Sequence, residues 1–356
     1  MESLGGDFKG KLRVSVVLWI SKFKMDTMSA SRNYGKVTEM KKVVWPDLYD
    51  FTFTATEQVK DWDRLHTLAE VDVYFDKPDL TTYLDRCKDA TAIALNWVHL
   101  TKDLLDQLPK LELICPLAVS VNQVDLKHAE KLGITVCNAP HYSDSTMAEH
   151  ALGLMLSLCR GITKADREIR EGKWNAIEGT DLRGSTLGIV GIGGIGSELA
   201  AMGNALGMNV IANTKRPSNE RAKAHGVQFK ELDELLIGSD FVQLAVTLTD
   251  ETTHLIGKRE FELMKPSAYL INISRAQVVE ENSLLEVLRS RRIAGYATDV
   301  FEKEPSYNHP LATMDNVVVT PHMAWNTPRA GRGLLNVVTG NLLSFLEGNP
   351  QNVVSS

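Results

Sequence analysis

The sequence predicts an α/β fold made of two doubly wound parallel sheets. Short apolar runs alternate with helical stretches from Met40 onward, which is the pattern of consecutive β–α–β units. A glycine-rich turn follows one of these runs at Gly191, near the middle of the chain. The chain of 356 residues is also long for one hydrophobic core, because domains average about 150 residues. We therefore expect two domains.

The composition is that of a globular protein that folds in water. Apolar residues make up 44% of the chain and charged residues 24%. The net charge of −6, with no block of like charges, argues against nucleic acid or an anionic membrane as the main partner. No apolar run approaches the roughly 18 residues that a membrane-spanning helix needs. We expect a cytoplasmic protein that binds neither nucleic acid nor membrane.

Residues 1–39 form an N-terminal extension that we expect to be poorly ordered. The basic segment Lys9 to Arg13 and the apolar segment Val14 to Ile20 imitate a signal peptide. No small-residue cleavage site follows, however, and lysines interrupt the apolar stretch. The α/β pattern begins at Met40, so the extension is either a tail or an upstream start.

Cysteine usage predicts neither a zinc site nor a disulfide framework. Cys87, Cys115, Cys137 and Cys159 lie far apart in the sequence, without a CxxC pair or a histidine-rich neighbourhood. We expect four buried, reduced thiols and no metal site.

The first half of the chain contains five predicted strands but no glycine phosphate turn. After them comes the segment His150 to Ile162, which is apolar nearly all round and predicts a helix buried between domains or between subunits. The expected strands are residues 43–44, 71–75, 92–95, 113–115 and 135–138, and the clearest helices are residues 79–87 and 101–107.

The stretch at residues 186–196 predicts a dinucleotide pyrophosphate site. The apolar run Leu187 to Val190 leads directly into Gly191, Gly193 and Gly196, which have GxGxxG spacing. A helix is expected over residues 197–206, because good helix formers fill it and Gly207 stands where a C-terminal cap belongs. Glycines let the backbone approach the phosphates, while the N–H groups and dipole of the helix face the anion.

Further β–α–β units follow the glycine turn and predict a second doubly wound sheet. The chain then runs into a long amphipathic helix, which Gly348 and Pro350 end. The expected strands are residues 209–212, 229, 241–246, 268–273, 293–297 and 317–320, and the helices include residues 283–291 and 327–347.

Three charged or titratable residues follow apolar strands of this second half. Arg275 comes after the strand at 268–273, Glu304 precedes Pro305, and His322 follows the last strand. Open α/β sheets bind their ligands at the carboxyl ends of strands, so the three residues are candidates for a shared active site. Taken singly, the arginine is also explained by a surface ion pair and the histidine by a structural role.

In order, these residues and the glycine turn resemble the D-isomer-specific 2-hydroxyacid dehydrogenase family, over residues 40–354. The resemblance implies a Rossmann-type cofactor domain at residues 144–325, inserted in a flavodoxin-like substrate domain that residues 40–143 and 326–356 form. The matching stretches are GITVCNAP (133–140), MAEH (147–150), residues 187–196 and 241–256, INISRA (271–276), AGYATDVFEKEP (294–305) and TPHMAW (320–325).

The resemblance implies that Arg275, Glu304 and His322 are the catalytic residues. The guanidinium fork of Arg275 would bind the carboxylate of a 2-oxo acid and polarise its keto oxygen. Protonated His322 would donate a proton to that oxygen during reduction and take it back during oxidation. Glu304 would orient the imidazole and favour its charged form.

The resemblance also assigns cofactor and substrate contacts. Val119 and Ser120 match the loop whose backbone amides meet the substrate carboxylate, although Ser120 stands where glycine is usual. Asn96, Trp97 and Trp325 match the border of the substrate side chain, either as an apolar wall or as plain core. The cofactor contacts are Gly191, Gly193, Gly194, Ile195, Gly196, Thr214, Lys215, Arg216, Val246, Thr247, Thr252, Ile273, Asp299 and His322.

The residues after the second strand of the cofactor domain favour NADP(H), with NAD(H) possible. An NAD site usually has an acidic residue about 20 residues after the glycines, to bind the ribose hydroxyl. This chain has Thr214, Lys215 and Arg216 there instead. A hydroxyl and two cations suit a 2′-phosphate, and the alternative is a solvated turn.

The expected substrate is a small 2-oxo acid or the matching D-2-hydroxy acid. Pro116 and Leu117 offer no cation for a phosphorylated acid, which favours glyoxylate, hydroxypyruvate or a larger apolar acid over phosphoglycerate. Formate and phosphite dehydrogenases share the family architecture and stay open as alternatives. So does a nucleotide-sensing binding protein that resembles the family's corepressors. The resemblance further implies a homodimer, with residues 147–162 and 163–174 near the subunit contact.

Overall fold

The computed structural model describes residues 40–49 and 59–354. The predicted N-terminal extension, residues 1–39, lies outside the described residues. Two separate parallel sheets with helices around them make up the described chain. The predicted fold class is therefore confirmed, whereas the exact domain bounds stay a prediction.

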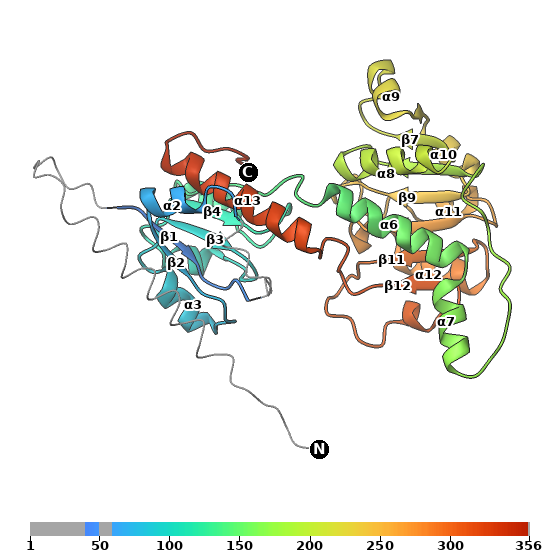
Figure 1. Cartoon of the computed structure of the whole chain (residues 1–356), viewed down its shortest axis with the longest axis horizontal. Coiled ribbons are helices and arrows are strands. Elements are labelled where there is room, and N and C mark those ends of the chain that lie inside the picture. The colour runs from blue at the N-terminus through green and yellow to red at the C-terminus, as the bar shows by residue number, and fades with distance from the viewer. Residues whose placement is uncertain (1–39, 50–58, 355–356) are drawn as a thin grey trace, which may run out of the picture. The chain divides into compact units, whose positions relative to one another are not determined.

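The first sheet has five parallel strands in the order β2-β1-β3-β4-β5. Figure 1 labels β1, β2, β3 and β4 of this sheet. Neighbouring side chains of β1 enter opposite cores, because a strand points successive residues to opposite faces. Val43 belongs to a buried cluster with Leu65 of α2 and Leu334 of α13, and Val44 to one with Tyr83 of α3. The strands are β1 (Lys42–Trp45), β2 (Glu70–Val73), β3 (Ala92–Leu95), β4 (Leu113–Pro116) and β5 (Thr135–Val136), and the helices are α2 (Trp62–Leu68), α3 (Leu80–Cys87), α4 (Lys102–Leu105), α5 (Leu126–Lys131) and α13 (Pro328–Leu346).

The end of the chain completes this first sheet. Thr327 caps the N-terminus of helix α13, because its hydroxyl accepts a hydrogen bond from the Ala330 N–H at 3.2 Å. The helix packs against α2 and β4. Beyond it, Val353 forms an antiparallel bridge with Cys137, next to the edge strand β5. The last described residues thus cover a strand edge that would otherwise be open.

The second sheet has seven parallel strands in the order β12-β11-β10-β9-β6-β7-β8. The chain moves from β6 outward to β8 and then returns to β9 on the other side of β6, so strand order reverses beside β6. A ligand site is expected at the carboxyl end of such a switch point. The strands are β6 (Thr186–Val190), β7 (Asn209–Asn213), β8 (Gln228–Phe229), β9 (Phe241–Leu244), β10 (Tyr269–Asn272), β11 (Gly295–Thr298) and β12 (Val317–Val319).

Helices cover both faces of this sheet. Ile189 of β6 is buried with Leu154 of α6 and Leu199 of α8, whereas the next residue, Val190, is buried with Leu235 of α10. The β9 and β6 strands, in the middle of the sheet, consist almost wholly of buried residues, as expected for a parallel sheet covered twice. The helices are α6 (Asp144–Cys159), α7 (Ile162–Arg170), α8 (Gly194–Ala205), α9 (Asn219–His225), α10 (Leu232–Gly238), α11 (Lys258–Leu263) and α12 (Glu281–Arg289).

Two helix predictions need correction. The helix predicted from His150 is α6, which already begins at Asp144 and lies on the second sheet, against α8, β10 and β11. Its Leu156 is 36% exposed in the single chain, so the burial of this helix between subunits stays a prediction. The helix predicted from residue 197 begins at Gly194, because the glycine turn itself supplies the first helical turn.

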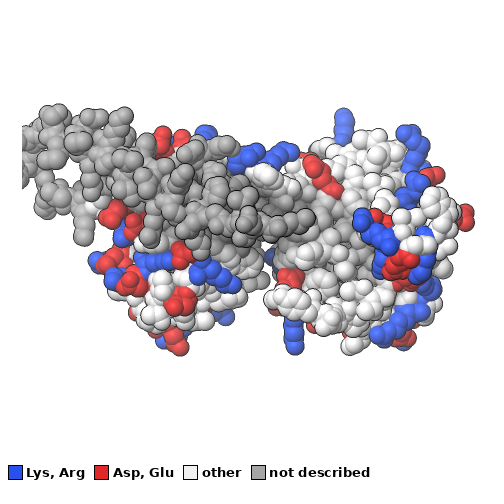
Figure 2. All heavy atoms as spheres, turned by 60° about the horizontal axis from the view of Figure 1, so that its bottom comes forward, with Lys and Arg blue, Asp and Glu red and all other residues white. Residues whose placement is uncertain are grey.

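Other features follow the sequence predictions. The four cysteines are free and buried. Among the described residues, no helix is both long and apolar enough to cross a membrane. On the face shown in Figure 2, lysines and arginines lie among aspartates and glutamates instead of forming one basic patch.

Candidate active site

The glycine turn between β6 and α8 is closed so tightly that two of its positions accept only glycine. Gly191 has φ +99°, and a Cβ atom there would lie 2.5 Å from the Ala245 carbonyl oxygen. A Cβ atom on Gly196 would lie 2.1 Å from the carbonyl oxygen of Gly191 itself. The spacing of these glycines is thus a steric requirement of the strand–turn–helix junction.

The same turn leaves room for a dinucleotide at Gly193. A Cβ atom on Gly193 would meet nothing within 4 Å, so the backbone is open on that side. No side chain caps α8, and its first N–H groups are therefore available to an anion. Gly194 is closed by Asp144, whose Oδ2 would lie 1.8 Å from a Cβ atom. The predicted Gly191, Gly193, Gly194 and Gly196 together fit a pyrophosphate cradle.

Arg221 of α9, which follows β7, is a charged side chain near the predicted cofactor site that the sequence pattern did not single out. Arg221 of α9 donates to the carbonyl oxygen of Ile192 in the glycine turn at 3.0 Å, and to that of Arg216. Its guanidinium also lies 3.4 Å from the Thr214 hydroxyl oxygen. Among the described residues, no carboxylate forms an ion pair with Arg221. The predicted Lys215, by contrast, is paired with Glu251.

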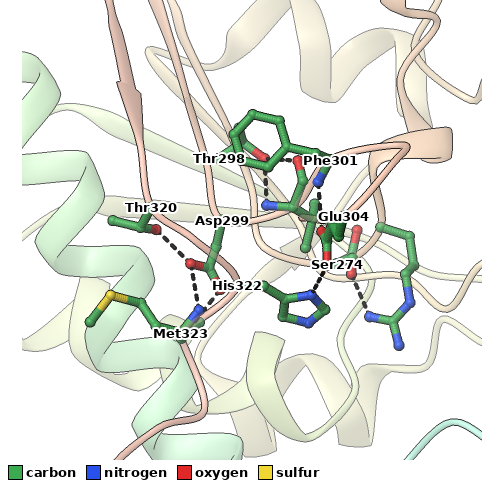
Figure 3. A network of polar contacts seen from close by, with 11 residues as sticks. Ser274, Thr298, Asp299, Phe301, Glu304, Thr320, His322 and Met323 are labelled. Atoms are coloured by element: carbon green, nitrogen blue, oxygen red, sulfur yellow. Dashed lines mark hydrogen bonds and ion pairs between the residues drawn. The ribbon is translucent and has the colours of Figure 1, made fainter. Parts of the chain in front are cut away.

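The three predicted catalytic residues follow three adjacent strands. The order β12-β11-β10 places the carboxyl ends of these strands side by side, and His322, Glu304 and Arg275 follow them in turn. Nδ1 of His322 lies 2.5 Å from Oε2 of Glu304, and Figure 3 shows the two side chains pointing toward one another. The other carboxylate oxygen of Glu304 accepts a hydrogen bond from the Phe301 N–H at 2.8 Å. The carboxylate is therefore held in place on both sides.

Arg275 lies in a braced turn after β10. The guanidinium donates to the carbonyl oxygen of Ser274 at 2.7 Å. Asn272, which is fully buried, donates to the carbonyl oxygen of Arg275 at 2.9 Å and accepts from the Ser274 N–H at 3.0 Å. Because a neutral carbonyl oxygen and no carboxylate binds its guanidinium among the described contacts, Arg275 keeps its charge available for an anion.

Asp299 holds the loop that carries His322. The carboxylate is 1% exposed and accepts hydrogen bonds from the Thr320 hydroxyl at 2.5 Å and from the N–H groups of Met323 and Ala324 at 2.9 and 2.8 Å (Figure 3). His322 itself has φ +51°, a left-handed conformation that costs a non-glycine residue about 1–2 kcal/mol. The buried carboxylate thus stabilises an unfavourable backbone turn.

His150 of α6 extends this network. Its Nε2 lies 3.0 Å from the Thr320 hydroxyl oxygen and 3.7 Å from Oδ1 of Asp299. The MAEH stretch contributed to the family resemblance, but no role was predicted for its histidine. No local sequence pattern could indicate this contact, because 170 residues separate His150 from Thr320.

Other predicted cofactor contacts have structural roles in the described residues. The Thr252 hydroxyl donates to the carbonyl oxygen of Thr247 at 2.7 Å and accepts from the Thr249 N–H at 2.7 Å. The side chain of Ile273 is 1% exposed and belongs to the core. Val246 and Ile195 are partly buried against the two clusters of the second sheet. Their roles in cofactor binding stay predictions.

The predicted substrate residues of the first sheet lie beyond β3 and β4. Trp97 is 56% exposed and Val119 51% exposed, so neither is core. Asn138 donates to the carbonyl oxygen of Val119 at 2.9 Å and braces the loop that contains Ser120. Trp325 is half-buried. The alternative of Trp97 as a plain core residue is therefore wrong.

Two parallel α/β sheets, with a pyrophosphate cradle on one and a paired histidine and glutamate at its edge, define a dinucleotide-dependent dehydrogenase. Residues 152–324 match the model of the D-isomer specific 2-hydroxyacid dehydrogenase NAD binding domain. The chain belongs to the D-isomer specific 2-hydroxyacid dehydrogenase family.

Individual relatives are similar in sequence to this chain over most of its length. The glyoxylate reductase of Thermococcus litoralis is 38% identical over 289 residues, which are 78% of this chain and 87% of the relative. That of Aeropyrum pernix is 36% identical over 309 residues, or 83% and 89%. The solved structure of an acyclic imino acid reductase in complex with NADPH and D-Arg has a TM-score of 0.77 at 26% identity, and the match covers 88% of this chain and 99% of that one.

Proposed function

We propose that this enzyme reduces a small, unphosphorylated 2-oxo acid to the D-2-hydroxy acid and favours NADPH over NADH. The contact between His322 and Glu304, beside the turn of Arg275, carries this proposal. Two of the relatives with matching length are glyoxylate reductases, which supports a short 2-oxo acid. The nicotinamide, when bound, supplies the hydride.

The residues at this site can bind the substrate carboxylate and supply the proton that such a reduction needs. Arg275 binds the substrate carboxylate and polarises the keto oxygen, because its fork matches both oxygens of a carboxylate. Glu304 accepts the hydrogen of Nδ1 of His322, which leaves Nε2 to face the substrate. As carbon 2 gains a hydride, Nε2 gives its proton to the keto oxygen, and the neutral imidazole takes one back in the reverse direction.

Arg221 supports the preference for NADPH. Its guanidinium lies beside the Thr214 hydroxyl, at the end of β7 where the adenosine ribose is expected. A charged hydrogen bond is worth roughly 1.5–3 kcal/mol, which corresponds to about a ten- to hundredfold preference. Lys215 contributes less than the sequence suggests, because Glu251 already neutralises it. The solved imino acid reductase also binds NADPH.

Steady-state kinetics with glyoxylate, hydroxypyruvate and phenylpyruvate, each with NADPH and NADH, tests this function. We expect turnover of at least one acid, a higher kcat/KM with NADPH, and loss of turnover in His322→Gln. His128→Gln is the matched control, because His128 lies on α5 and pairs with Asp106. Protein that binds NADPH but reduces none of the acids would instead support a nucleotide-sensing binding protein, and equal or better use of NADH would reject the cofactor preference.

We also propose a homodimer that forms through α7 and the segment after it. Ile162, Ile169 and Trp174 are 54%, 51% and 91% exposed, and large exposed apolar side chains in one segment mark an association surface. Sedimentation over a dilution series should show a dimer that Trp174→Ser weakens. A monomer at every concentration would contradict the proposal.

A further inference from the structure

We propose that Asp144 places a negative charge beside the pyrophosphate cradle, and that this charge weakens cofactor binding and speeds cofactor release. Asp144 is the first residue of α6, and Gly194, which it contacts, is the first residue of α8. The inference rests on the proposed function, because it concerns the pyrophosphate that NADPH and NADH share.

The carboxylate of Asp144 fills the space that a side chain at position 194 would occupy. A Cβ atom on Gly194 would lie 1.8 Å from Oδ2 and 2.4 Å from Cγ of Asp144. The contact is part of helix packing, because α6 and α8 lie against each other and share one buried cluster on the second sheet. Gly194 does not have a positive φ. The neighbouring acid, and not the backbone conformation, therefore explains why this position has no side chain.

His141 holds the carboxylate of Asp144 in this position. Nδ1 of His141 lies 2.7 Å from Oδ2 of Asp144. The Asp144 side chain is 24% exposed and that of His141 75%. Among the described contacts, no lysine or arginine forms an ion pair with Asp144. The carboxylate is thus partly shielded from water, and no permanent cation neutralises its charge.

This charge stabilises the empty cradle and disfavours the occupied one. The N-terminus of a helix attracts anions through its free N–H groups and its dipole, so the carboxylate of Asp144 is favourably placed beside α8 when no cofactor is bound. The fold binds the pyrophosphate at the same helix terminus. A bound dinucleotide must therefore share that terminus with a carboxylate, and like charges at such short range repel one another.

A weaker affinity serves an enzyme that must release the oxidised dinucleotide after each reduction. Differences in affinity of this kind appear mainly in the dissociation rate. Asp144 should act equally on NADPH and NADH, because both contain the pyrophosphate. Its effect thereby differs from that of Arg221, which contacts the Thr214 hydroxyl and is expected to distinguish the two cofactors.

The test measures the Kd and the dissociation rate of NADPH and NADH by fluorescence in the full-length enzyme. For Asp144→Asn we expect both Kd values to fall about three- to tenfold, with slower dissociation and an unchanged NADPH-to-NADH ratio. Asp144→Ser removes the same charge with a smaller side chain and should act in the same direction. The difference from the wild type should shrink in about 1 M salt, because salt screens the repulsion.

Glu149→Gln is the matched control, because Glu149 is an exposed acid farther along α6 and should change neither Kd by more than about twofold. Adenosine 2′-monophosphate, which has no pyrophosphate, should compete equally well for the wild type and for Asp144→Asn.

A Kd of NADPH that stays the same or rises in both Asp144→Asn and Asp144→Ser would overturn this inference. So would an equal gain for adenosine 2′-monophosphate, or a gain that salt leaves unchanged. Wild-type protein that binds neither NADPH nor NADH would instead overturn the proposed function.

Discussion

Replacing Asp299 by asparagine should lower kcat while the enzyme stays folded. Asparagine keeps one neutral acceptor oxygen, so one of the two backbone N–H groups, on Met323 or Ala324, loses its acceptor and the other loses the charge of its acceptor. Such a bond is worth roughly 1.5–3 kcal/mol, which is comparable to the strain of about 1–2 kcal/mol at His322. The turn then loses most of the energy that keeps His322 in its left-handed conformation, and kcat should fall about ten- to hundredfold.

The assay separates positioning from cofactor binding, the role that the family resemblance assigns to Asp299. We would measure kcat at saturating NADPH, the Kd of NADPH by fluorescence titration, and the melting temperature. Thr320→Val is the companion variant, because it removes the hydroxyl donor to Asp299 and leaves both backbone bonds. It should lower kcat less than Asp299→Asn does.

A variant that binds NADPH more weakly but reaches the wild-type kcat at saturation would refute this reasoning. So would a Thr320→Val enzyme that loses as much turnover as Asp299→Asn, because the two backbone bonds would then not be the decisive contacts.

Three further predictions concern the cofactor domain. Arg221→Gln should reduce the NADPH-to-NADH ratio of kcat/KM about tenfold or more, and Lys223→Gln, on the same helix, should leave it unchanged. Glu251→Gln should raise that ratio, because it releases Lys215 from its ion pair; an unchanged ratio would show that Lys215 does not reach the phosphate. Burial raises the pKa of Asp240, but the hydrogen bonds from Lys265 and from the Thr186 N–H outweigh it and lower the pKa below its ordinary value. Its stabilising contribution is therefore present above the ordinary carboxyl pKa and lost as the pH falls through the lower folded value, so the melting-temperature gap between wild type and Asp240→Asn should be largest near pH 7 and should shrink as the pH falls below the ordinary carboxyl pKa. A gap that does not change with pH would contradict this.

The parallel strands were predictable because their burial on both faces leaves a strong mark in the sequence. Leu187 to Val190 is an unbroken apolar run, and β6 occupies residues 186–190. The closeness of the candidate catalytic residues was predictable for a related reason. Arg275, Glu304 and His322 each follow a different strand within six residues, and a parallel sheet brings the ends of adjacent strands together.

The contacts that support the site were less predictable. His150 approaches Asp299 only because α6 packs across the second sheet. Arg221 approaches the glycine turn because α9 packs against α8, and the sequence shows it only as one cation among several. The pairing of Lys215 with Glu251 is equally invisible, since 36 residues separate the two. Each case depends on a tertiary contact, which no local pattern records.

The four native cysteines are poorly accessible to thiol reagents because they are buried. Cys87, Cys115 and Cys137 have no exposed surface and Cys159 is 2% exposed. Burial raises the pKa of the Cys87 thiol to about 12, so almost none of it is a reactive thiolate at neutral pH. A cysteine introduced at an exposed position would therefore be the first to react with a thiol-specific dye. One such label on each sheet would test, by energy transfer, whether the two sheets approach one another when substrate binds, without removing any native residue.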